Sequence, residues 1–564
     1  MPTRGTQLAL ALAAVSLPLA LWNSDIIPHE AFGIANFPVS YLLGLVVGSG
    51  AVAISSFKNS RTRIGWLALI LLEACLWLVP LRLMPILPFA GSNHDFTLFP
   101  DLLGLTLTGH LNPNALIYQS LPGFYILGSA FLTLSGMQNY LQIFEFTPFC
   151  LNLVASVFLY IFFRALLKPS HTNLALVAVA LFELLNFAGV TTEFAFFSLA
   201  YLYFYFGLAV FAGLGFFERQ LRKIGGGGYL TLFLLFGAMS ITHPEVALAL
   251  LSVLFLVTTG RSIASKKWSL IRSYLTLDIL MTSILFSWTL YGATSFISAF
   301  QSTFRLALEF SPLSFLWGGT VTTISTASQG HAASDLVKTG VVASVCILSL
   351  PALARMRRGG VVSIMSYALI GIVIEAVLVG NFQGVSFVPR FFGYALPFIL
   401  ILNVLSLRHS KHVFVLTAVF LVASSPAFVA TSYANVEVDL LPSSVIQAAT
   451  YFGNMLPSLT EYGQYSVYEF QVLGTYGPNP SNMIPYIDIL SPTSQLIPSA
   501  ADFFSTSALA TASFIVTGTN TQQFISFYGG SVNAASEVTN HLAENSSYDV
   551  VYSSSSVILF TNPK

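Results

Sequence analysis

Residues 391–430 read FFGYALPFILILNVLSLRHSKHVFVLTAVFLVASSPAFVA, and this stretch decides the class of fold. Its two apolar runs, 391–407 and 412–430, are each about as long as a helix that crosses a bilayer. Arg408 and Lys411 lie in the short connection between them, as is typical of two consecutive transmembrane helices. The stretch predicts a polytopic α-helical membrane protein.

The rest of the chain has the same character. Only 8% of its 564 residues are charged and 55% are hydrophobic, whereas about 25% charged residues are usual in soluble domains. A soluble fold is therefore excluded. Apolar runs of sufficient length predict about thirteen transmembrane helices, at 7–22, 40–57, 64–84, 146–167, 173–190, 194–217, 229–242, 245–260, 270–291, 336–354, 361–380, 391–407 and 412–430.

The basic residues orient these helices, because Lys and Arg concentrate in cytoplasmic loops. Eighteen of the 23 Lys and Arg residues, beginning with Arg4, fall on one side of the predicted helices. This predicts a cell-membrane protein with a cytoplasmic amino terminus. Segment 121–136 is apolar enough to insert. A crossing there would place Arg164 outside the cell and would reverse the predicted orientation of the loops that follow. We therefore expect it to form an interfacial or re-entrant helix on the outer face.

Three regions follow from this topology. Residues 1–63 hold two amino-terminal helices, and residues 64–430 form a transmembrane core with outer loops 85–145 and 292–335. Residues 431–564 carry nine acidic residues and no Lys or Arg before Lys564, so they are expected outside the cytoplasm. Strand-like runs predict an α/β or α+β domain there; they lie at 512–518, 549–552 and 556–560, and 532–544 has a helical pattern.

The first outer loop contains the strongest candidate for a catalytic group. Asp95 follows His94 directly after a predicted helix, so its carboxylate is expected near the membrane surface, where it could accept a proton from an acceptor hydroxyl. The alternative is that Asp95 only caps the next helix, since Asp is favoured there. Asp101 is a weaker candidate on the same grounds, and His94 and Asp101 are candidates for binding the substrate.

A second candidate is the turn Thr242-His243-Pro244-Glu245, between two short apolar runs. Pro244 and Glu245 are also what the start of a helix favours, but this does not account for His243. His243 and Glu245 are therefore candidates for binding a phosphate or a sugar.

The third candidate is Arg390, at the end of the predicted outer loop 381–390 (NFQGVSFVPR). Arg390 and Arg305 are the only basic residues in the predicted outer loops. Guanidinium groups bind phosphate in a bidentate fork. Arg390 and Arg305 are therefore candidate phosphate ligands. Snorkelling of Arg390 to the membrane surface is the alternative.

The motif TGHLNPN at 108–114, the run LPGFYILGSAFLTLSG at 121–136 and the basic helix end FFRALLK at 162–168 together resemble the opening of GT-C-type membrane glycosyltransferases. The resemblance implies a GT-C-like fold with Asp95 as catalytic base. It implies a sugar donor linked to polyprenyl or dolichyl phosphate, and a glycan, lipid or protein acceptor in the cell envelope. No metal cofactor is required when the leaving group is a monophosphate.

Two other functions remain open. Glu73, Glu183, Asp278 and Glu375 lie within or near apolar runs, and intramembrane carboxylates often mark the path of an ion, as in a transporter or channel. A non-catalytic envelope scaffold is the other. The net charge is zero and the basic residues are spread over separate loops, so nucleic-acid binding is not expected. Gly225–Gly228 is interpreted as a linker between helices.

Overall fold

The structure is a computed structural model, and it describes the chain in segments. These are residues 4–22, 37–57, 62–80, 102, 105–106, 109–110, 121–135, 140–167, 172–186, 196–217, 226–265, 268–292, 329–354, 360–383, 388–407, 411–432, 462–464, 486–488, 514–517, 540–544, 549–553 and 558–561.

The described chain is mostly helical, and each of the predicted transmembrane segments overlaps one of its helices. Among the described residues, five helices are apolar and long enough to cross a membrane by themselves. The full number of crossings stays a prediction. The helices are α1 (Arg4–Leu21), α2 (Val39–Phe57), α3 (Thr62–Trp77), α6 (Pro122–Ser135), α7 (Tyr140–Leu166), α8 (Thr172–Leu185), α9 (Phe196–Gly213), α10 (Gly226–Thr242), α11 (Pro244–Ser265), α12 (Trp268–Ser287), α15 (Gln329–Leu353), α16 (Val361–Gln383), α17 (Val388–Leu407) and α18 (Lys411–Ser432).

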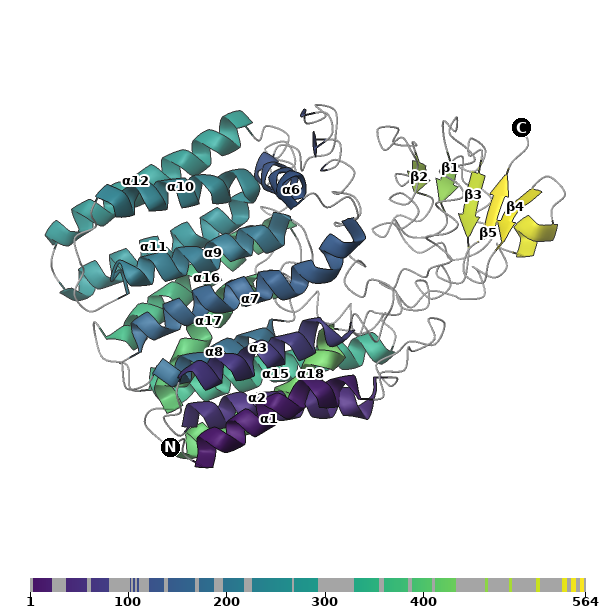
Figure 1. Cartoon of the computed structure of the whole chain (residues 1–564). Coiled ribbons are helices and arrows are strands. Elements are labelled where there is room, and N and C mark those ends of the chain that lie inside the picture. The colour runs from purple at the N-terminus through teal and green to yellow at the C-terminus, as the bar shows by residue number, and fades with distance from the viewer. Residues whose placement is uncertain are drawn as a thin grey trace.

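Segments far apart in sequence pack side by side in the bundle (Figure 1). The late helix α18 lies against α2, where the hydroxyl groups of Ser49 and Ser425 hydrogen-bond at 2.6 Å. Elsewhere α11 packs on α16, and a Cβ atom at Gly371 would lie 2.8 Å from the Ser252 carbonyl oxygen. Glycine is required at position 371 because the two backbones approach so closely.

Several helices begin earlier than the sequence predicts, and α7 begins at Tyr140, inside the predicted outer loop 85–145. Three further starts change an interpretation. Gly226–Gly228 form the first turn of α10, so the interpretation of these glycines as a linker was wrong. Helix α15 begins at Gln329, inside the predicted outer loop 292–335. Helix α17 begins at Val388, which places Arg390 in its first turn rather than in a loop. Polar and glycine residues at helix ends hide these turns from a search for apolar runs.

Helix α6 is short and lies at one end of the bundle, out of line with the long helices (Figure 1). It packs against α9 and α10. Pro122 is its first residue, where the missing amide hydrogen of proline costs nothing. This position suits an interfacial helix. The side of the membrane on which α6 lies stays a prediction.

Five short strands follow the helices, and Figure 1 shows them standing apart from the bundle, on the side away from the amino terminus. They are β1 (Tyr462–Gln464), β2 (Tyr486–Asp488), β3 (Phe514–Thr517), β4 (Asp549–Ser553) and β5 (Ile558–Thr561), in the order β2-β1-β3-β5-β4. Strand β1 is parallel to β2 and β3, while β5 is antiparallel to β3 and β4. Three of the strands match the predicted runs. The fold of the whole region 431–564 stays a prediction.

Candidate functional site

His243 alone connects α10 to α11. Its amide donates to the Met239 carbonyl at 2.8 Å, as in the last turn of α10, and its own carbonyl accepts the Val246 amide at 3.1 Å, as in the first turn of α11. The two helices pack against each other, so the chain reverses within this single residue. Pro244 at the first helical position makes the abrupt start possible. His243 and Glu245 are both buried, at 8% and 6% exposure.

The start of α6 is in direct contact with this turn. A Cβ atom at Gly123 would lie 2.3 Å from Thr242 Oγ1 and 3.0 Å from the Thr242 amide nitrogen. The Thr242 hydroxyl is held in place because it donates to the Ala238 carbonyl at 2.7 Å. Two motifs that the sequence analysis selected separately, Leu-Pro-Gly at 121–123 and Thr-His-Pro-Glu at 242–245, are therefore neighbours.

This contact predicts the effect of adding one methyl group. Gly123→Ala should push α6 away from Thr242 and lower stability by about 1–3 kcal/mol, the usual cost of overpacking. The measurement is the apparent unfolding temperature of the purified protein, followed by tryptophan fluorescence. Gly227→Ala is the matched control, because Gly227 is also the second residue of its helix and has nothing within 4 Å of its Cβ position. Equal unfolding temperatures for the two variants would contradict the contact.

Glu245 belongs to a buried group of acidic and phenolic side chains. Glu375 of α16 is 1% exposed, and its carboxyl lies close enough to that of Glu245 for an electrostatic interaction. Both carboxyl groups also interact electrostatically with the Tyr394 hydroxyl of α17. The group forms where the first turn of α11 meets the last part of α16 and the first part of α17. We call Glu245, Glu375 and Tyr394, with Tyr201 described next, the outer cluster, after the side of the membrane on which the sequence predicts the turn at His243.

Tyr201 of α9 completes the outer cluster. Its ring stacks on that of Tyr394 with centroids 4.5 Å apart and planes inclined by 15°, and the two hydroxyl groups hydrogen-bond. Both side chains are 1% exposed. The stack fixes the start of α17 against the start of α9. Arg390 occupies the position four residues before Tyr394, one helical turn nearer the start of α17.

The structure therefore brings together some of the candidate residues of the sequence. His243 and Glu245 lie in the turn between α10 and α11, and the backbone of Arg390 lies one turn from Tyr394 in the outer cluster. His94, Asp95, Asp101 and Arg305 lie outside the described residues, and their roles stay predictions.

Tyr201, Tyr394 and the position of Glu375 in this cluster were not predicted from the sequence. Glu375 did stand out as a carboxylate in an apolar run, but it was assigned to the transport alternative. Tyr201 gave no signal, because five of the six residues in the run 201–206 (YLYFYF) are aromatic, and Tyr394 lies within the apolar run 391–400 (FFGYALPFIL).

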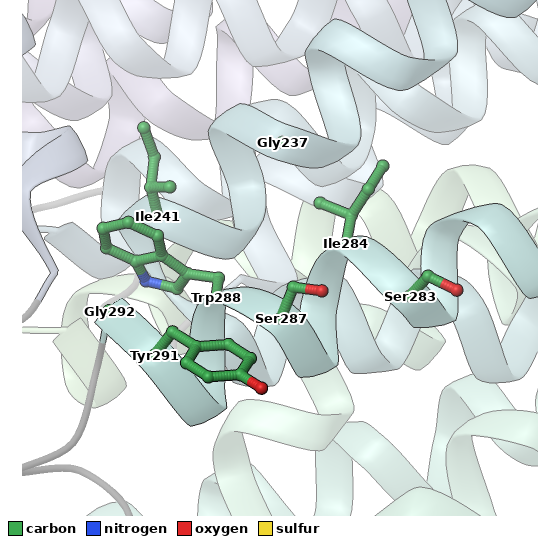
Figure 2. A pocket seen from close by; sticks show the side chains of 8 residues that line it. All are labelled: Gly237, Ile241, Ser283, Ile284, Ser287, Trp288, Tyr291 and Gly292. Atoms are coloured by element: carbon green, nitrogen blue, oxygen red, sulfur yellow. The ribbon is translucent and has the colours of Figure 1, made fainter.

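An open groove of about 630 Å³ lies beside the turn at His243, between α10 and α12 (Figure 2). Gly237 and Ile241 of α10 line one wall. Ser283, Ile284 and Ser287 of α12 line the other, together with Trp288, Tyr291 and Gly292 of the π-helical turn η5 (Trp288–Gly292) that ends α12. Such π-helical turns are often found at functional sites.

The surroundings of the groove are apolar. Phe286 of α12 and Leu234 of α10 are both more than half exposed, beside the residues that line it. Ile241 lies only two residues before His243, so the groove runs up to the turn that carries His243 and Glu245.

Comparisons with known proteins agree with the predicted fold. No protein-family model matches the chain, and no curated protein matches its sequence. Among solved structures, the chain is similar to ArnT from Cupriavidus metallidurans in the apo state, with a TM-score of 0.50 and 14% identity, covering 89% of this chain and 98% of that one. It also matches the Archaeoglobus fulgidus oligosaccharyltransferase tethered to an acceptor peptide, with a TM-score of 0.48 and 10% identity, covering 94% of this chain and 75% of that one.

The likeness to ArnT confirms the prediction of a GT-C-type fold. At 14% identity it shows the fold alone.

Proposed function

We propose that this protein is a membrane glycosyltransferase that moves a sugar from a polyprenyl- or dolichyl-phosphate donor to a glycan, lipid or protein acceptor on the outer face of the membrane. A fold by itself does not fix a function, so the proposal depends on the site. One observation carries it. The start of α6, the turn at His243 and the first turns of α17 are gathered at one end of the bundle, although the sequence spreads them over more than 250 residues.

In the proposed reaction, the acceptor hydroxyl oxygen attacks the anomeric carbon of the donor sugar. Asp95 takes the hydroxyl proton as the new carbon–oxygen bond forms. The bond between the anomeric carbon and the phosphate oxygen breaks, and its electron pair leaves with the lipid phosphate. Arg390 stabilises the negative charge of that phosphate. The leaving group is a monophosphate, so the reaction needs no metal ion.

The described residues support separate parts of this scheme. His243 and Glu245 lie where α6 covers the turn between α10 and α11, and we assign them to the polar part of the donor, its sugar and phosphate. The apolar groove between α10 and α12 begins two residues away and suits the hydrocarbon chain of the donor. The Tyr201–Tyr394 stack sets the position of the turn that carries Arg390. Tyr201 and Tyr394 are therefore positioning residues.

The test is transfer of a radiolabelled sugar from a polyprenyl-phosphate carrier in membranes that contain the full chain. We expect label to appear in an acceptor fraction only when the chain is present. The same protein in sealed liposomes should give no ion or solute flux above that of empty liposomes, because the proposed reaction moves a sugar from a donor to an acceptor and carries nothing across the membrane. Flux without transfer would support the transporter, and neither activity would support the scaffold.

A further inference from the structure

A second pair of acidic side chains is buried among α3, α7, α8 and α9, apart from the outer cluster. Glu73 of α3 and Glu183 of α8 are both 0% exposed, and their carboxyl groups interact electrostatically. The hydroxyl of Ser156 in α7 donates to Glu183 Oε1 at 3.0 Å and also lies close to Glu73. One hydroxyl group therefore lies between two carboxyl groups in the apolar bundle.

These groups offer more acceptor atoms than the surrounding side chains satisfy. Within the described part of the chain, both carboxyl oxygens of Glu73 and Oε2 of Glu183 are buried and lie beyond hydrogen-bond distance of any donor, although the indole N–H of Trp77 in α3 also interacts with Glu183. Among the described residues, the hydroxyl of Tyr205 in α9 is likewise buried without a hydrogen-bond partner. It interacts electrostatically with Glu183. Buried polar atoms without a partner are costly, and their presence at one place needs a cause.

No basic side chain of the described segments pairs with either carboxyl group. The basic residues of α3, α7, α8 and α9 lie in the terminal turns of those helices. In α3, Arg63 is ten residues from Glu73, which is about 15 Å along a helix. The other is Arg164, in the last turn of α7.

We propose that Glu73 and Glu183 form a binding site for a small monovalent cation, Na⁺ or H⁺, inside the helical bundle. Two carboxylates side by side in an apolar interior repel each other and have lost their hydration, so one of them must be neutralised. The hydrogen bond from Ser156 stabilises the charge that remains on Glu183. Carboxylate and hydroxyl oxygens are the ligands that hard cations prefer, and the Tyr205 hydroxyl adds one more oxygen. This site is independent of the proposed transferase activity.

The experiment measures the apparent unfolding temperature of the purified full chain at pH 8.5 and at pH 6, in Na⁺ or in choline at equal ionic strength. A cation that binds only the folded protein raises this temperature. If Na⁺ is the ligand, wild type at pH 8.5 should unfold about 2–4 °C higher in Na⁺ than in choline. If the proton is the ligand, the rise should come from lowering the pH, equally in both salts. An unfolding temperature of wild type that responds to neither would overturn the proposal.

Variants assign the response to the pair. The double variant Glu73→Gln/Glu183→Gln should lose the Na⁺ response and the part of the pH response that the pair contributes, whereas Asp278→Asn, which removes a buried carboxyl from α12, should keep the Na⁺ response and the pair's part of the pH response. An unchanged response in the double variant would overturn the proposal. If that variant does not fold, Ser156→Ala keeps both acids and removes the hydroxyl between them. The Ser156→Ala variant should need about tenfold more Na⁺ for the same rise in unfolding temperature. If the proton is the ligand, that rise should occur at a pH shifted by about one unit. A response identical to that of wild type would also count against the site.

Discussion

Replacing Asp95 with Asn should lower the rate of sugar transfer by a factor of about 10² to 10⁴, the usual contribution of a general base. The substitution keeps the size and polarity of the side chain and removes its ability to accept the acceptor's proton. The measurement is transfer from a radiolabelled polyprenyl-phosphate sugar, at equal amounts of protein in the membrane. Asp95→Glu keeps a carboxylate on a longer stem, so it should retain part of the activity.

A different outcome would return Asp95 to a structural role. Asn is as good an N-cap residue as Asp. If Asp95 only caps a helix, Asp95→Asn should therefore transfer sugar at the wild-type rate, and the unfolding temperature should be unchanged. Normal transfer by this variant would remove the proposed base.

Replacing Arg390 with Ala should reduce donor use at least about tenfold, because a hydrogen bond to a charged group is worth roughly 1.5 to 3 kcal/mol. Arg390→Lys keeps the charge but loses the bidentate geometry, so it should keep partial activity. Both variants are compared with wild type in the same transfer assay, over a range of donor concentrations. This distinguishes weaker donor binding from slower chemistry.

Arg164→Ala is the matched control for this series. Arg164 also lies in a terminal turn of its helix, the last turn of α7, on the side that is predicted to be cytoplasmic. It should transfer sugar normally. If Arg390 only snorkels to the membrane surface, Arg390→Ala should behave like Arg164→Ala, and a full rate for both would remove the proposed phosphate ligand.

The sequence predicts the helices of this fold well, for a physical reason. In a bilayer every backbone amide and carbonyl must be satisfied within its own helix, so an apolar run of sufficient length has few other structures available. The ends of helices are less constrained. Gly226–Gly228 and Val388–Arg390 continue helices into polar sequence, and hydropathy alone does not show this.

The site is only partly visible in the sequence. The turn at His243 is marked by its own residues, and Gly123 belongs to a recognisable motif. The pairing of Glu245 with Glu375 is different, because it depends on how α11 packs against α16, more than 100 residues later. The partner of Tyr201 likewise follows from the approach of α9 to α17. Such pairs are properties of the assembled bundle.

The single-residue connection at His243 couples the position of the groove directly to that of the outer cluster. Helix α10 forms a wall of the groove, and one residue later α11 presents Glu245 to Glu375. A longer loop could change conformation when α10 is displaced, so that α11 would stay in place. A single connecting residue cannot, so a displacement of α10 is transmitted to α11. A molecule that enters the groove and shifts α10 would therefore move Glu245 relative to Glu375. The separation of these two carboxyl groups would then depend on whether the groove is occupied.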